Sequence, residues 1–131
     1  MLFRSKDGEE EEEVMGNPVV SQALETKTVT IASGASLSGA VDLGGRKLVA
    51  IVMPSGWTSA ALTFQASVDG ASYYNVYDGS TERSVAVDAD YYSMLAIGDY
   101  VGVRYLKVRS GTAASAVNQG ADRTLTLVLQ P

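Results

Sequence analysis

The chain has 131 residues, no cysteine, no histidine and a formal net charge of −5. This length fits one domain with a single two-layer core. The missing cysteines exclude disulfides and thiolate nucleophiles, and the missing histidines remove the commonest zinc ligand and the best proton-transfer group near neutral pH. We therefore expect no enzyme, no cofactor and no metal site.

The net charge lies entirely in the first 25 residues. Residues 1–25 hold two basic and seven acidic side chains, whereas residues 26–131 hold eight of each. A neutral body lacks the clustered basic face that nucleic-acid binding normally uses. We expect an acidic N-terminal arm over 1–25, a folded body over 26–131 and no nucleic-acid partner.

Five consecutive glutamates dominate the arm: Glu9, Glu10, Glu11, Glu12 and Glu13. Such runs are usually solvated tails that repel themselves. The alternative is an extended docking segment that lies on a basic surface of a neighbouring subunit. The chain opens without a basic region followed by an apolar one, and no apolar run approaches the ~20 residues that span a bilayer. We expect cytoplasmic synthesis and no membrane partner.

The first half of the body reads as short strands separated by turns. Residues 27–31 alternate, with Val29 and Ile31 inward, and residues 37–43 form the next predicted strand. Gly44-Gly45 predicts a two-residue hairpin loop with positive φ at both positions. It leads into the apolar run 48–53, whose lack of alternation predicts a central strand covered on both faces.

A β-hairpin is predicted over residues 62–78. Leu62, Phe64, Ala66 and Val68 alternate with polar residues, and Asp69-Gly70 suits a tight turn. A second strand follows, over 73–78.

The rest of the body continues the same rhythm. Strands are predicted over 83–87 and 91–95, joined by a turn at 88–90, and then over 104–109, with Leu106 and Val108 inward. A loop rich in glycine, alanine and serine covers 110–120, and the last strand, 123–129, points Leu125, Leu127 and Leu129 inward. About nine strands at this spacing predict an all-β chain, a β-sandwich or jelly roll.

Two carboxylate groupings invite a calcium reading. Asp88 and Asp90 are two residues apart and would share a face of a strand, and Asp69, Asn75 and Asp78 supply further oxygens. The first grouping has no third or fourth oxygen donor nearby in sequence and falls in a predicted turn. The second misses the spacing of a calcium loop, and Asp69-Gly70 is already explained as a turn. We expect solvated turns rather than metal ligands.

Serine chemistry needs a base, and without histidine only a lysine could serve. Lys27, Lys47 and Lys107 all fall in strand patterns, where an outward, solvated lysine is the ordinary outcome. We therefore expect no serine–lysine enzyme.

The aromatic residues are the remaining candidates for binding. Trp57, Tyr73, Tyr74 and Tyr77 each offer a wide apolar face with a polar tip, which suits a sugar platform or a protein interface. The alternative is ordinary packing, and Trp57 could either cap the core or project from its loop.

Two stretches resemble the galactose-binding-like jelly rolls of the discoidin type. The first is the run Phe64 to Gly70 with Tyr73 and Tyr77, in the predicted hairpin, and the second is the late strand Arg104-Tyr105-Leu106-Lys107-Val108. The resemblance implies the fold, but the ligand loops of that family are not matched, so it implies no sugar site.

The whole body, residues 26–130, also resembles short virion proteins of tailed bacteriophages. The stretches that carry this resemblance are 28–31, 41–45, 53–57 and 106–111. It implies a structural protein on the capsid exterior, a decoration or cement protein that binds the major capsid protein and acts as a homo-oligomer, with a trimer favoured. The arm would then dock on neighbouring subunits through Glu9–Glu13.

The alternative function is a carbohydrate-binding module of a phage head fibre, tail fibre or tail tip. It would bind a surface glycan by stacking sugars on Trp57, Tyr73, Tyr74 and Tyr77.

Overall fold

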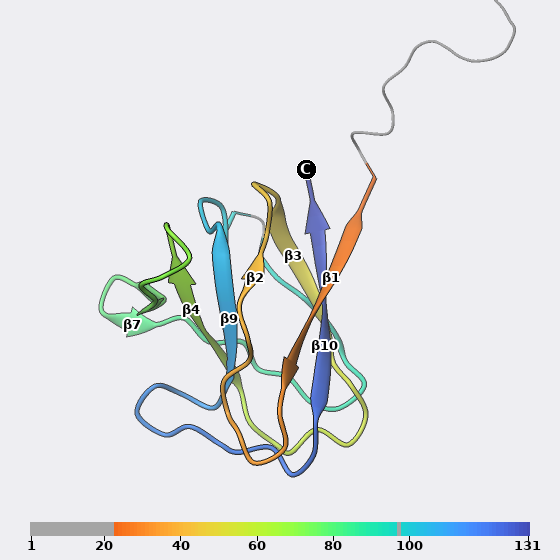
Figure 1. The fold of residues 1–131 in the computed structure, drawn as a ribbon. Helices are drawn as coiled ribbons and strands as arrows, with labels where there is room; N and C mark the ends of the chain where they lie inside the picture. Colours follow the sequence, from red (N-terminus) through yellow and green to blue (C-terminus); the bar gives the residue numbers. More distant parts are fainter. Residues whose placement is uncertain (1–22, 97) are drawn as a thin grey trace, which may run out of the picture.

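The computed structural model describes residues 23–96 and 98–131 (Figure 1). These residues contain strands and no helix. The strands are β1 (Glu25–Ile31), β2 (Val41–Asp42), β3 (Lys47–Val52), β4 (Leu62–Ser67), β5 (Tyr74–Asn75), β6 (Tyr77–Asp78), β7 (Thr81–Glu82), β8 (Tyr92–Met94), β9 (Tyr105–Ser110) and β10 (Arg123–Gln130). The predicted all-β fold is confirmed. No helix in this part of the chain is long and apolar enough to cross a membrane.

Two four-stranded antiparallel sheets form the body, and Figure 1 shows their layers. Sheet A has the strand order β1-β10-β3-β8, and sheet B has the order β2-β9-β4-β5. The short β6-β7 hairpin projects beside sheet B. Because Glu25 pairs with Leu129, β1 begins and β10 ends at the same end of the sandwich.

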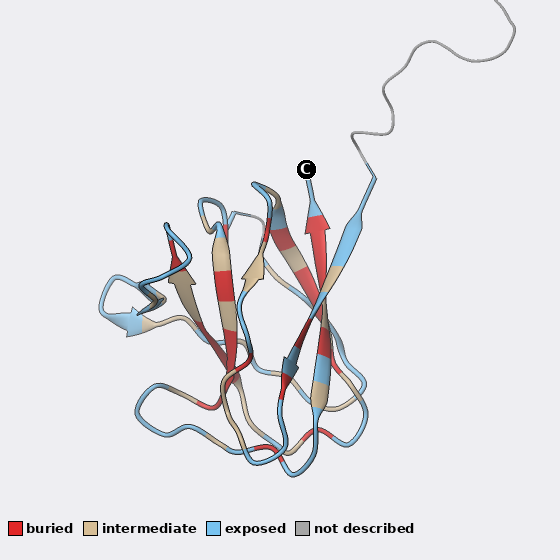
Figure 2. Cartoon of the chain, in the orientation of Figure 1, coloured by how far each residue is buried: buried red, intermediate tan, exposed pale blue. Residues whose placement is uncertain are grey.

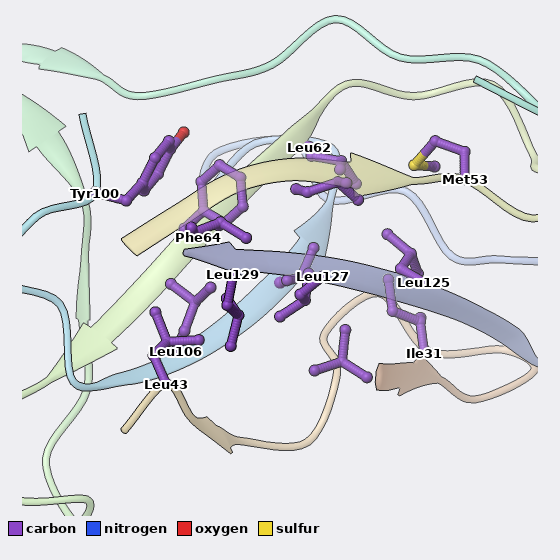
Figure 3. Close-up of a cluster of buried hydrophobic side chains, with 14 of the residues drawn as sticks. Ile31, Leu43, Met53, Leu62, Phe64, Tyr100, Leu106, Leu125, Leu127 and Leu129 are labelled. Atoms are coloured by element: carbon purple, nitrogen blue, oxygen red, sulfur yellow. The ribbon is translucent and has the colours of Figure 1, made fainter. Parts of the chain in front are cut away.

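The core lies between the two sheets. Leucines from sheet A meet Phe64, Leu106 and Leu43 from the sheet B side, as Figure 3 shows. Phe64 and Tyr100 pack edge to face, with ring centroids 5.1 Å apart. In Figure 2 the buried positions recur along β10, β9, β3 and β4, the inner strands of both sheets.

The predicted alternation is confirmed in the long strands. Val29 and Ile31 point inward from β1, and Leu106 and Val108 point inward from β9. Leu125, Leu127 and Leu129 are fully buried on β10. A period of two with apolar residues on one face is sufficient to fix which face of a strand is buried.

The predicted central strand 48–53 is β3, which pairs with β10 on one side and β8 on the other. A register shift between Val128 and Leu129 leaves Val49 as an extra residue opposite β10. This bulge explains why the apolar run does not alternate. Residues three apart lie on opposite faces of a regular strand, but Leu48 and Ile51 both point inward because the extra residue lies between them.

The turn at Gly44-Gly45 has the predicted backbone, with φ of 65° and 79°. The Arg46 N–H donates to the Leu43 carbonyl at 3.2 Å, which closes the turn. The predicted hairpin is nevertheless wrong, because β2 belongs to sheet B and β3 to sheet A. The glycines reverse the chain between layers rather than between neighbouring strands.

The hairpin predicted over 62–78 exists as β4 and β5, but with a wider loop than expected. β4 ends at Ser67 and β5 begins at Tyr74, so six residues connect the strands, and Val68 among them is 89 % exposed. The Asp69 carboxylate accepts hydrogen bonds from the N–H groups of Ala71 and Ser72 and stabilises this loop. The second predicted strand divides into β5 and β6.

Two further strand predictions are wrong in extent. In 37–43 the strand is reduced to β2. The Val108 N–H donates to the Ser38 hydroxyl oxygen at 2.9 Å, and this bond replaces a backbone hydrogen bond of the sheet. In 83–87 only Val85 forms a bridge, to Leu62. Arg83 instead reaches Asp78 and Asp99.

Candidate binding surfaces

The outward side chains of sheet A form three rows across the sheet. They point outward because their neighbours along each strand point into the core. The registers give the rows Thr30–Thr124; Thr28–Thr126–Val52–Tyr92; and Thr26–Val128–Ala50–Met94. We call these ten residues the threonine face.

None of the ten residues of the threonine face carries a charge. Thr26, Thr28, Thr30, Thr124 and Tyr92 are exposed, and Met94 is 72 % exposed. The first charged side chain along the sheet is Lys47, opposite Gln130 at the end of the face. Depletion of charge is the compositional mark of the buried centre of protein interfaces.

The opposite surface, the outer face of sheet B, is closed by its own chain. Arg109 of β9 is 7 % exposed and donates to Glu82 at 3.1 Å, Asn75 at 2.7 Å and Thr63 at 3.3 Å. Glu82 also accepts from the Ala113 N–H at 3.2 Å. We call this network the Arg109 clasp, and it holds β5, β7 and the 110–120 loop against β4 and β9.

A groove lies at the end of the sandwich where β1 begins. One part is a hollow of about 240 Å³ lined by Gly45, Arg46, Lys47, Val101, Gly102, Val103 and Arg104. The other part is a smaller hollow of about 150 Å³ lined by Ala66, Ser67, Val68, Tyr74, Gly102 and Val103. Because Gly102 and Val103 line both, we treat the two hollows as one end groove, cationic at one side and apolar at the other.

Carboxylates hold two of the groove's cations in place. Arg46 Nε lies 2.7 Å from Glu25, and Arg104 binds Asp42 with two hydrogen bonds of 2.7 and 3.1 Å. The Arg104 hydrogen bond, helped by the Gly44 N–H, lowers the pKa of Asp42 to about 2. Asp42 is therefore ionised at every physiological pH.

A polar hollow of about 380 Å³ lies over the β6-β7 hairpin, lined by Asp78, Thr81, Glu82, Arg83 and Ser84. Its carboxylates are already engaged by arginines: Asp78 by Arg83 and Glu82 by Arg109. Within residues 23–96 and 98–131 no three acidic side chains gather as a metal site would require.

Three of the acidic residues considered as calcium ligands, Asp69, Asp88 and Asp90, lie in turns or loops, and Asp78 lies on β6. The Asp88 carboxylate accepts from the Ala89 N–H at 2.8 Å, and Asp90 has a φ of 64°, a left-handed turn conformation. Asp69 uses its carboxylate inside the 68–73 loop, where the N–H groups of Ser72 and Ala71 and the Ser67 hydroxyl lower its pKa to about 2.

The predicted binding residues do not form one platform. Glu9, Glu10, Glu11, Glu12 and Glu13 lie outside the described residues. Trp57 is 6 % exposed and donates from Nε1 to the Ala60 carbonyl at 3.1 Å, so it caps the core and presents no ring face to a sugar. Its aromatic body is apolar surface that the core buries in full.

The three tyrosines are separated from Trp57, and they lie against different parts of the surface. Trp57 precedes the start of β4, whereas Tyr74 pairs near the end of that strand, roughly 15 Å along it. Tyr73 is half-buried under Lys107, whose Nζ lies 4.4 Å from the ring centroid. Tyr74 enters the end groove, and Tyr77 lies on β6. This separation gives the glycan platform no geometric support.

Comparison with known proteins adds no assignment: no protein-family model, no curated protein and no solved structure matches the chain significantly.

Sequence reasoning missed the threonine face and the Arg109 clasp. The face had a signal, since Thr26, Thr28 and Thr30 alternate on one strand and Thr124 and Thr126 on another. Their meeting depended on the pairing of β1 with β10, which are nearly 100 residues apart in sequence. The Arg109 clasp had no signal in the sequence, because Arg109 occupies an outward strand position that usually faces water.

Proposed function

We propose that this chain is a structural virion protein that binds and stabilises the outer surface of a bacteriophage capsid. The observation that carries the proposal is the threonine face, whose ten outward residues include no charged side chain and whose exposed members are Thr26, Thr28, Thr30, Thr124, Tyr92 and Met94. A surface that meets only water normally carries lysine and glutamate, whereas the centre of an interface is depleted of them. The resemblance of residues 26–130 to phage virion proteins supports the capsid as the partner.

The size of the face indicates how it would be used. Four strands about 4.8 Å apart and about five residues of 3.3 Å give an area of roughly 300 Å². A stable interface buries about 800 Å² on each partner. The threonine face therefore makes a weak contact alone and needs a second contact, which the N-terminal arm would supply on a neighbouring subunit.

A capsid lattice suits a protein of this kind. Linked weak contacts to several subunits bind together far more tightly than any single contact. A homotrimer at a local three-fold position would present three threonine faces to the shell, with its arms docked on neighbouring subunits, and would cement the subunits that it bridges.

We also infer that the sandwich is a jelly roll. Successive strands of the two main sheets alternate between sheet A and sheet B, except for the step from β4 to β5. Two interleaved Greek keys produce this alternation. The inference agrees with the jelly-roll resemblance of the 64–77 and 104–108 stretches.

Electron microscopy of decorated shells tests the proposed function. The purified chain is mixed with empty capsids assembled from a phage major capsid protein, and the bound copies are counted in the reconstruction. We expect added density on the shell exterior, with sheet A facing the capsid. Bare shells at saturating protein, or density attached through the Arg109 clasp, would reject the proposal.

A further inference from the structure

The end groove has the dimensions and chemistry of a peptide site. We propose that it binds the segment Glu9–Met15 of a second copy of this chain, so that copies join in succession. The inference rests on the proposed function, in which the arm docks on a neighbour, and it identifies the receiving surface and the partner as the chain itself.

The charges of the two elements are complementary. The larger hollow is lined by Arg46, Lys47 and Arg104 and by no carboxylate. Arg46 contacts Glu25 through Nε, so its two terminal nitrogens can donate to further carboxylates. Arg104 binds Asp42 through Nε and Nη2, so its Nη1 can do the same. Glu9–Glu13 is the only dense source of carboxylates in the sequence.

The order of residues matches as well. The glutamate run is followed directly by Val14 and Met15. The groove likewise changes from its cationic part to the apolar part lined by Val68, Tyr74 and Val103. An extended segment with its glutamates beside Lys47 would place its apolar residues over the smaller hollow, where Val68 and Tyr74 are 89 % and 70 % exposed.

Because Glu25 lies on Arg46 at the end groove, the same copy's segment would have to reverse its direction to enter that groove, whereas a neighbour's segment would not. Residues 23–25 lead into β1 from outside the sandwich, as Figure 1 shows, and Leu24 is 58 % exposed. Leu24 is nine residues further along the chain than Met15, and an extended chain of that length reaches roughly 30 Å. The segment can therefore reach the end groove of an adjacent copy.

Disulfide trapping in the full-length chain tests the contact directly, because the sequence has no cysteine of its own. Val14→Cys is combined with Val101→Cys, an exposed position at the groove. The matched pair combines Val14→Cys with Ala114→Cys, which is exposed in the loop at the other end of the sandwich. Each single variant reports links between identical positions.

We expect the groove pair to form covalent dimers and longer ladders on a non-reducing gel, several-fold faster than the matched pair and the single variants. Adding Lys47→Glu should slow the linking by roughly threefold to tenfold, and 0.5 M salt should slow it too. Lys107→Glu makes the same charge change outside the groove and should leave the rate within about twofold.

Equal linking by the two pairs would overturn the proposal, as would a disulfide closed within one chain or equal effects of the two lysine variants. Because trapping uses the protein alone, its failure is separate from failure to decorate capsids. Ladders without capsid binding would leave the groove contact standing and reject the proposed function.

Discussion

Arg109 Nη1 lies 3.1 Å from the Glu82 carboxylate, and this ion pair closes the outer face of sheet B. The two side chains are 9 % and 16 % exposed, so both charges have lost most of their water. On the outer face of sheet A, Thr28, Thr30, Tyr92 and Met94 are exposed, Ala50 and Val128 are buried, and the rows carry no charge. The sandwich thus has one face whose charges are paired within the chain and one whose exposed residues are uncharged.

Removing one partner of the Arg109 clasp should destabilise the fold. Glu82→Ala leaves the Arg109 guanidinium buried with fewer acceptors, and breaking a buried pair in this way costs about 3 kcal/mol. Urea unfolding measures the change. Asp78→Ala is the matched control, since that carboxylate is 72 % exposed and its pair with Arg83 should contribute less than about 1 kcal/mol. Equal losses in the two variants would show that the clasp has no special role.

Tyr100→Phe should stabilise the protein. The Tyr100 hydroxyl is buried among the core residues and has no hydrogen-bond partner in the part of the chain that the structure describes. Its removal relieves a desolvation cost of about 1 kcal/mol, which denaturant unfolding at pH 7 would detect as a higher midpoint. A loss of stability would mean that the hydroxyl has a partner.

The same hydroxyl should make stability depend on alkaline pH. Burial raises the pKa of Tyr100 from 10.0 to about 12. As the pH rises, the unfolded chain therefore releases this proton first. The free energy of unfolding of the natural protein is unaffected by this proton below pH 10 and falls as the pH rises from 10 toward 12. The advantage of Tyr100→Phe over the natural protein should grow across that window, and a constant difference would contradict the assignment.

Asp69 should contribute to stability above about pH 4 and lose that contribution in acid. The Ser72 and Ala71 N–H groups and the Ser67 hydroxyl lower its pKa to about 2 in the folded protein, from an ordinary 3.8. The unfolded chain takes up the proton first as the pH falls, which favours unfolding. The stability difference between the natural protein and Asp69→Asn should shrink between pH 4 and pH 2 in thermal unfolding. A difference that stays level would contradict this.

Gly111 should tolerate no side chain. Its φ is +89°, and an added Cβ would lie 2.6 Å from the Ser115 carbonyl oxygen. Gly111→Ala should cost about 3 kcal/mol, since it combines left-handed strain with a backbone clash. Gly39→Ala is the control, with open space and no positive φ, and should be neutral or slightly stabilising. The two melting temperatures decide the comparison.

The parts of the fold that follow from local pattern were predictable. Val29, Leu106 and Leu127 are inward because polar and apolar residues alternate around them, and the φ values of Gly44 and Gly45 follow from their lack of a Cβ. The predicted hairpin at these glycines was wrong because sequence specifies a turn but not which layer each flanking strand joins.

The candidate surfaces depended on pairings between distant strands. The threonine face forms only when β1 and β10 meet, and the end groove only when the 45–47 and 101–104 turns lie together. For Trp57 the sequence left two positions open. A lone aromatic residue after a turn fits a binding platform and a core cap equally well, and the hydrogen bond to the Ala60 carbonyl identifies it as a core cap.

Charge placed on the threonine face tests its role as the capsid-binding surface most directly. Thr28→Lys and Met94→Lys introduce cations at exposed positions of the face, and Ala114→Lys introduces one in an exposed loop away from it. Co-sedimentation with empty capsids measures the retained protein. We expect binding to fall at least tenfold in the Thr28→Lys and Met94→Lys double variant and to be unchanged in Ala114→Lys, with similar melting temperatures throughout. Full capsid binding by the folded double variant would contradict the proposed role of the face.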